Sequence, residues 1–189
     1  QARSEEGKVL LEVVAHDDGC RSFVLETKAG SVVDLPDYVR NALLCSPVTA
    51  LSPDGRYLVY TNRAGRMLEY YDFVQKRPRP LLERIGAVEG ISDIVWAQAN
   101  KQLYAACILT NPEEYLYNTR IYIFKISANG VVTPYTYDQP AWYVCRSRTG
   151  TCIARKDDDF RFNNKNNFVY RVRRGEQMTE EFATIELPK

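Results

Sequence analysis

The sequence has a single histidine, His16, among its 189 residues. Catalytic triads, imidazole acid–base pairs and most zinc sites need histidine, often more than one. The chain also has neither a Gly-x-Ser-x-Gly nucleophile elbow nor a glycine-rich phosphate loop. These absences argue against the commonest hydrolase, zinc-enzyme and nucleotide-binding designs. We therefore expect no catalytic residue, no metal site and no cofactor.

An excess of one charge is absent as well. The chain carries 25 basic and 24 acidic residues, for a net charge of +1. A balanced chain has no overall field that attracts nucleic acid or an anionic membrane surface. It also lacks a run of about 18 apolar residues, the length that a membrane-spanning helix requires. We expect neither a nucleic-acid partner nor a membrane span.

Helix-favouring runs are scarce, whereas segments rich in valine and tyrosine recur between turn residues. Such segments are typical of β-strands. A chain of this length fits one domain that buries roughly 70% of its unfolded surface. The composition therefore predicts a single all-β domain spanning residues 1–189.

The clearest turn signal is Ser52-Pro53-Asp54-Gly55, directly before the alternating stretch Tyr57–Tyr60. Proline presets the first corner of a turn, aspartate can bond its own backbone, and glycine accepts a left-handed conformation. A second copy of the pattern, Trp96–Ala105, has Asn100 at the position of the glycine. Asparagine is the best substitute there.

Weaker copies of the turn lie at Asp17–Gly19 and Ser147–Gly150. A period of about 40 to 50 residues with four short strands matches a β-propeller blade. We place the approximate repeats at 8–45, 46–90, 91–139 and 140–189.

In the first repeat, the expected strands are Lys8–Ala15, Arg21–Thr27 and Ser31–Leu35, followed at 37–44 by a short helix or an outer strand. In the second they are Val48–Ser52, Arg56–Asn62, Arg66–Phe73 and Pro80–Ile85. In the third they are Asp93–Ala97, Gln102–Leu109, Thr119–Ser127 and Val131–Tyr137. In the fourth they are Trp142–Arg146, Thr151–Lys156, Asn167–Arg174 and Glu181–Leu187.

The stretch Ser52–Tyr60 resembles the repeat signature of TolB-like and related WD-like β-propellers, whose Ser-Pro-Asp-Gly turn joins the first two strands of a blade. The resemblance implies a β-propeller-like fold, here with about four blades of mostly four antiparallel strands. Complete TolB-like propellers carry more blades than four. The chain is thus either a small four-bladed propeller or a partial one that completes itself by self-association.

The placement of the cysteines suggests one local pair. If 147–150 form a hairpin loop, Cys145 faces Cys152 across the strands. A disulfide is one interpretation, and two buried thiols in a tight blade core is the other. We expect Cys107, in the middle of a strand, to be a core residue. Cys20 and Cys45 could pair, but no spacing compels it.

Two long connections, 110–118 and 157–166, combine aromatic and charged residues in the way that binding surfaces do. We predict a partner-binding face at Arg63, Glu113, Tyr115, Asp158, Phe160 and Arg161. The alternative is that these aromatic rings fold back over the blade edges.

The acidic run 157–159 could hold calcium, although the ordered calcium-loop spacing is absent and a flexible polar loop is the other interpretation. Arg171 and Arg173 are expected on one face of an exposed outer strand. They could hold an acidic partner there, but we favour the interpretation that they block edge-to-edge aggregation.

These observations favour a non-catalytic interaction scaffold that binds a protein or peptide partner through loops on one face. One alternative is a carbohydrate-active or other hydrolytic propeller that uses loop carboxylates such as Glu113 and Asp158. Another is an accessory propeller that restricts access to a separate enzyme. The polar start, residues 1–7, lacks an initiator methionine and an apolar signal region. It fits either a chain matured after export to the periplasm or outside the cell, or a trimmed sequence.

Overall fold

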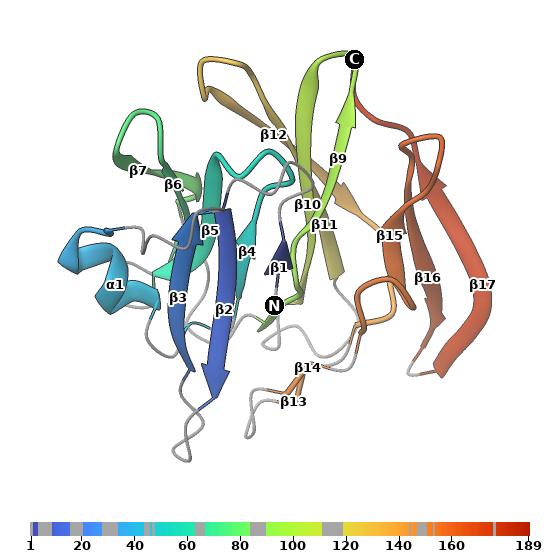
Figure 1. Cartoon of the computed structure of the whole chain (residues 1–189). Helices are drawn as coiled ribbons and strands as arrows, with labels where there is room; N and C mark the ends of the chain where they lie inside the picture. Colours follow the sequence, from blue (N-terminus) through green and yellow to red (C-terminus); the bar gives the residue numbers. More distant parts are fainter. Residues whose placement is uncertain are drawn as a thin grey trace. The chain divides into compact units, whose positions relative to one another are not determined.

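The computed structural model describes most of the chain (Figure 1). The described residues are 2–3, 9–15, 21–27, 34–43, 46, 48–62, 67–83, 90–110, 119–143, 145–146, 151–152, 154–175 and 177–189. The chain divides into two compact units, Gln1–Ile85 and Gly86–Lys189, which we describe separately. Within the described ranges, no helix is both long enough and apolar enough to cross a bilayer.

The first unit begins with a three-stranded antiparallel sheet and one helix. The elements are β1 (Ala2–Arg3), β2 (Val9–Ala15), β3 (Arg21–Thr27) and α1 (Asp37–Leu43). Two of the three strands predicted in this region match β2 and β3. Of the third, Ser31–Leu35, residues 31–33 lie outside the described residues, and Asp34 and Leu35 are not in a strand. The segment at 37–44 is a helix rather than an outer strand. Val39 and Leu43 lie one turn apart on α1 and are both buried. They pack against Leu58, Tyr60 and Tyr71, so the helix covers apolar side chains of the next sheet.

The second sheet of the first unit is a four-stranded antiparallel meander, the construction of a propeller blade. Its strands are β4 (Thr49–Leu51), β5 (Tyr57–Asn62), β6 (Met67–Asp72) and β7 (Arg77–Leu82). The last strand begins at Arg77, three residues before the predicted start at Pro80. Pro78 and Pro80 are compatible with β7 because it is an outer strand, where a missing backbone N–H breaks no ladder.

The turn between β4 and β5 forms as the sequence predicts. Gly55 has φ +70°, a left-handed conformation. Tyr57 N donates to Ser52 Oγ at 2.9 Å, and Ser52 N donates to Tyr57 O at 2.8 Å. The Asp54 carboxylate accepts hydrogen bonds from Arg56 N at 3.1 Å and from Ser52 Oγ at 2.5 Å. Asp54 thus stabilises the turn.

The first sheet of the second unit is also antiparallel. It contains β8 (Gly90–Ile91), β9 (Val95–Ala99), β10 (Gln102–Thr110), β11 (Thr119–Ile126) and β12 (Val132–Asp138). Asn100 and Lys101 link β9 to β10 with φ values of 51° and 61°, which confirms a left-handed residue at the second turn. Cys107 on β10 is fully buried, as expected.

The remaining strands of the second unit form two smaller sheets. They are β13 (Cys145–Arg146) with β14 (Thr151–Cys152), and β15 (Phe160–Phe162), β16 (Phe168–Arg174) and β17 (Gln177–Ile185). Cys145 lies opposite Cys152 in the register, as predicted. The prediction of a continuous loop over 157–166 was wrong, because β15 pairs with β16 inside it. The prediction that Arg171 and Arg173 lie on an outer strand was also wrong, because β16 is the central strand (Figure 1).

Among the described residues, one apolar cluster joins the β8–β12 sheet to the β15–β17 sheet of the second unit. Ile108 and Ile123, from β10 and β11, pack in one cluster with Phe160, Phe168 and Tyr170. The chain is therefore all-β, and its sheets are β-propeller-like. Among the described residues, the second and third predicted repeats each contain a four-stranded antiparallel meander.

Candidate functional site

An aromatic side chain is exposed on the outer strand of the last sheet. Phe182 on β17 is 41% exposed. Its ring centroid lies 4.6 Å from the guanidinium carbon of Arg171 and 5.4 Å from that of Arg161. We call Phe182 with these two arginines the Phe182 surface. Each contact has cation–π geometry, which is attractive even at exposed sites.

Strand alternation explains why these side chains meet. Arg171 pairs directly with Phe182, and Arg161 pairs with Val169, two residues before Arg171. Alternate residues of a strand point to the same face, so the two arginines and the ring share one face of the sheet. Phe160 and Tyr170 point to the other face and belong to the buried cluster. The sheet is thus apolar on its inner face and carries charge and one ring on its outer face.

Arg171 is held in place by hydrogen bonds in addition to its contact with the ring. Its Nε donates to Asp159 Oδ1 at 2.8 Å, and its Nη1 donates to Thr179 O at 3.1 Å and to Glu180 Oε2 at 3.2 Å. The bond to Asp159 is the main reason why the pKa of Arg171 is raised, despite the opposing effect of burial. Asp159 is itself fixed, because its Oδ2 accepts a hydrogen bond from Arg155 N at 2.7 Å. The guanidinium is therefore charged and oriented before any partner arrives.

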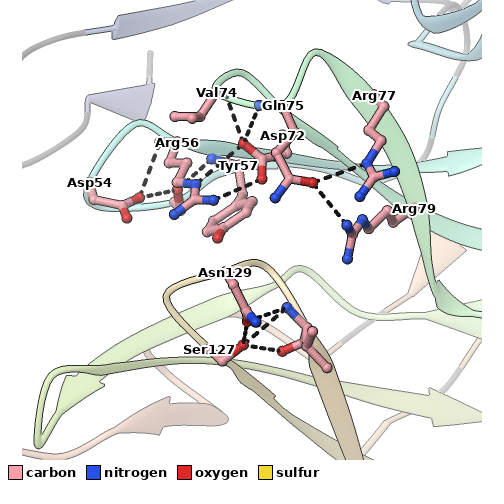
Figure 2. Close-up of polar contacts among 12 residues, drawn as sticks. Asp54, Arg56, Tyr57, Asp72, Val74, Gln75, Arg77, Arg79, Ser127 and Asn129 are labelled. Carbon is pink, nitrogen blue, oxygen red and sulfur yellow. Dashed lines mark hydrogen bonds and ion pairs between the residues drawn. The ribbon is translucent and has the colours of Figure 1, made fainter.

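A second polar cluster, around Asp72, lies in the first unit (Figure 2). The carboxylate accepts hydrogen bonds from Arg56 Nε at 3.2 Å and Nη2 at 3.0 Å, Val74 N at 2.9 Å and Gln75 N at 3.2 Å. Burial raises the pKa of Asp72, but these donors outweigh it and hold the pKa below its usual value. The Asp72 side chain has no exposure, and Arg56 also lies over the Tyr57 ring at 4.9 Å. This cluster fixes the β6–β7 turn against β5.

Beyond Asp72, two arginines of β7 point toward one amide. Gln75 Oε1 accepts hydrogen bonds from Arg77 Nε at 3.0 Å and from Arg79 Nη2 at 2.8 Å, as Figure 2 shows. The two arginines lie two residues apart on a strand and so share a face. We call them the arginine pair. Arg77 and Arg79 are not among the predicted binding residues, although the run 76–80 contains basic residues and prolines.

The predicted partner-binding residues have different outcomes. Arg63, Glu113 and Tyr115 lie outside the described residues, as do His16, Cys20 and Cys45. Phe160 does not lie on an exposed loop: it is on β15, has no exposure and lies 6.5 Å from Phe168 between ring centroids. It is a core residue because it faces the inside of the sheet. Asp158 is exposed in the turn before β15, and Arg161 belongs to the Phe182 surface.

Phe182 is not among the predicted binding residues. Its strand was expected to begin at Glu181 but begins at Gln177, and a register shift lies between Arg171 and Arg173 of the neighbouring strand. The pairing of Phe182 with Arg171 depends on that irregularity, which alternation alone does not reveal. The one local hint in the sequence is that Phe182 directly follows two acidic residues, Glu180 and Glu181.

Two further predictions concern metal binding and a disulfide. Among residues that the structure describes, no three or more histidine, cysteine, aspartate or glutamate side chains gather into a metal-binding group. Cys145 and Cys152 have opposed backbone positions, and the disulfide between them stays a prediction.

Comparison with family models gives no match, and comparison with curated proteins gives none either. Solved structures give distant likenesses. The acylaminoacyl peptidase of Pyrococcus horikoshii is 13% identical and matches 87% of this chain with a TM-score of 0.43. The chain spans only 26% of that peptidase's length.

In two other solved structures, this chain covers a larger share of the matched protein. A protein from Lactobacillus plantarum is 12% identical over 94% of this chain and 55% of its own, with a TM-score of 0.40. A Bacteroides uniformis protein, provisionally assigned as a 6-phosphogluconolactonase, is 14% identical over 96% of this chain and 70% of its own, with a TM-score of 0.33.

Proposed function

We propose that this protein is a non-catalytic interaction scaffold that binds a protein or peptide partner through the Phe182 surface. One observation carries the proposal: an aromatic ring that is 41% exposed lies against two guanidinium groups, at 4.6 and 5.4 Å. Aromatic residues, phenylalanine included, and arginine are enriched at protein interfaces. A partner that covers Phe182 would bury the ring and both cation–π contacts together.

The rigidity of the surface supports the same function. Arg171 is fixed by Asp159 and Glu180, and both arginines stand on strands of one sheet. Side chains that are already ordered lose little conformational entropy when a partner binds. Glu180 is 92% exposed and adds a carboxylate next to Arg171. The surface thus offers an apolar centre with charge of both signs around it, which suits a polypeptide.

The repeat assignment is part of the proposal. We assign Ser52–Tyr60 to a TolB-like or WD-like propeller repeat. The left-handed Gly55 and the hydrogen bonds of its turn support the assignment. In this view the strands are the scaffold, and the outer face of the last sheet is the recognition element.

The test compares partner capture by the wild type with capture by Phe182→Ala. Immobilised protein is incubated with an extract of the native compartment, and bound proteins are quantified by mass spectrometry. Tyr38→Ala is the matched control, because Tyr38 is an aromatic side chain that is 51% exposed, on α1 of the other unit. We expect proteins that the wild type and the Tyr38 variant capture and the Phe182 variant does not. An identical set of captured proteins for all three would refute the proposal.

The hydrolytic alternative has its own test. Purified protein is assayed on a panel of glycan and ester substrates, with Asp158→Asn as the comparison. Turnover that Asp158→Asn abolishes would favour the alternative and contradict a purely non-catalytic role. No turnover across the panel, together with capture that depends on Phe182, is the result that we expect.

A further inference from the structure

The arginine pair places two positive charges around one neutral oxygen. Arg77 Nε and Arg79 Nη2 lie 3.0 and 2.8 Å from Gln75 Oε1 (Figure 2). Two guanidinium groups that share an amide acceptor repel each other, and the amide carries no charge to offset the repulsion. A carboxylate or phosphate oxygen at the same point would accept stronger, charge-assisted hydrogen bonds from both.

The Asp72 carboxylate, which shares this face, is already engaged. Asp72 pairs with Arg77 in the strand register, yet its two oxygens accept from Arg56 and from the backbone of Val74 and Gln75. That set of donors satisfies the carboxylate of Asp72. Lys76, which is exposed and directly precedes Arg77, adds a third positive charge. The end of the β6–β7 hairpin therefore carries three basic side chains, those of Lys76, Arg77 and Arg79.

Protection of the sheet edge does not account for this charge. Arginine on an outer strand can block aggregation, but Pro78 and Pro80 already remove two N–H donors from β7. The same prolines prevent an extended partner from adding to the edge as a regular strand. A ligand at this place would have to be recognised by side chains, and the side chains that converge are the two arginines.

We infer that Arg77 and Arg79, assisted by Lys76, form an oxyanion-binding site for an acidic peptide segment, in which a Glu or Asp carboxylate takes the place of Gln75 Oε1. Two guanidinium forks match the oxygens of a carboxylate. Further carboxylates along the peptide segment form ionic contacts with Lys76. The site shares no residue with the Phe182 surface and does not depend on that surface being an interface.

The test measures binding of a fluorescein-labelled hexaglutamate peptide by fluorescence anisotropy, with hexaglutamine as the neutral peptide. The wild type should bind hexaglutamate and not hexaglutamine, and the affinity should fall as salt is added. The double variant Arg77→Gln, Arg79→Gln should lose about tenfold or more in affinity. Arg40→Gln is the matched control, since Arg40 is an exposed arginine of the same unit, on α1. It should bind like the wild type.

A second variant separates the site from any effect on folding. Gln75→Ala removes the competing acceptor and keeps both arginines, so it should bind hexaglutamate as tightly as the wild type or more tightly. Urea midpoints show whether each variant is folded. Equal affinity for the wild type and the double variant, or a loss in Gln75→Ala as large as in the double variant, would overturn the inference. So would binding of inorganic phosphate with no binding of hexaglutamate. None of these results bears on capture through Phe182.

Discussion

Asp72 and Arg56 form a two-point ion pair between β6 and the residue that precedes β5. Arg56 Nη2 lies 3.0 Å from Asp72 Oδ2, and Arg56 Nε lies 3.2 Å from Oδ1. The Asp72 side chain has no exposure, whereas that of Arg56 is 22% exposed. Because the same carboxylate also accepts from the backbone of the β6–β7 turn, one side chain connects three segments of the sheet.

Removal of the Asp72 charge should destabilise the protein. In Asp72→Asn the guanidinium of Arg56 loses its ionic partner in a largely buried place, which costs about 3 kcal/mol in the free energy of unfolding. Urea denaturation measures the loss. Asp138→Asn is the control, because Asp138 pairs with Arg120 at the surface, with side chains 83% and 47% exposed. Its effect should be below about 1 kcal/mol. Similar losses in both variants would contradict the role of Asp72.

The stability that Asp72 contributes should also depend on pH. Its pKa is lower in the folded protein than its unfolded value of about 3.9, so the unfolded state binds a proton more readily. The contribution is therefore complete above about pH 5 and is lost as the pH falls through the folded pKa. Urea midpoints of the wild type and Asp72→Asn, measured from neutral pH downward, should converge in acid. A difference between them that stays constant down to the lowest pH would contradict this.

The local part of the fold could be predicted from the sequence. The bounds of β3, β5 and β10 follow from alternating or β-branched residues between turn signals, and Gly55 and Asn100 have the left-handed backbone that the repeat predicts. These features depend on neighbours within a few residues. Alternation and turn chemistry therefore suffice to find them.

The candidate sites could not be predicted in the same way. β15 is three residues long and lies between polar turns, so nothing local distinguishes it from a loop. The Phe182 surface depends on pairing between three strands and on a register shift beside Arg171. The contact between Arg77, Arg79 and Gln75 depends on the turn that Asp72 closes. Each is a relationship between side chains whose positions only the folded sheets define.

Replacement of two phenylalanines of the last sheet should distinguish a core residue from a surface residue. Phe160, with no exposure, should cost about 3–5 kcal/mol in the free energy of unfolding when replaced by alanine, because the change leaves a cavity in the core. Phe182→Ala should cost about 1 kcal/mol or less, since it loses only partly exposed cation–π contacts. Thermal and urea unfolding of both variants measure the difference. If Phe160→Ala unfolded like the wild type, its ring would not be a core residue.

Cys107 should not react in the folded protein. Burial raises the pKa of its thiol to about 12, and only the thiolate reacts with iodoacetamide. Peptide mass spectrometry after alkylation near pH 8 should find Cys107 unmodified in native buffer and modified in urea. The urea sample is the control for reactivity. Equal modification in both would show that β10 does not bury this thiol.

The second and third predicted repeats share a left-handed turn position, at Gly55 and Asn100. Substitutions at this position should lower stability by graded amounts. Gly55 has φ +70°, and Asn100, at the matching position of the second copy, has φ 51°. A residue with a Cβ strains this conformation by about 1–2 kcal/mol, but asparagine tolerates it better than alanine does. In urea denaturation, Gly55→Ala should therefore lose more stability than Gly55→Asn. The reciprocal change, Asn100→Gly, should be close to neutral. Equal losses for the alanine and asparagine variants would show that the two turns do not share this requirement, and the repeat would then rest on sequence likeness alone.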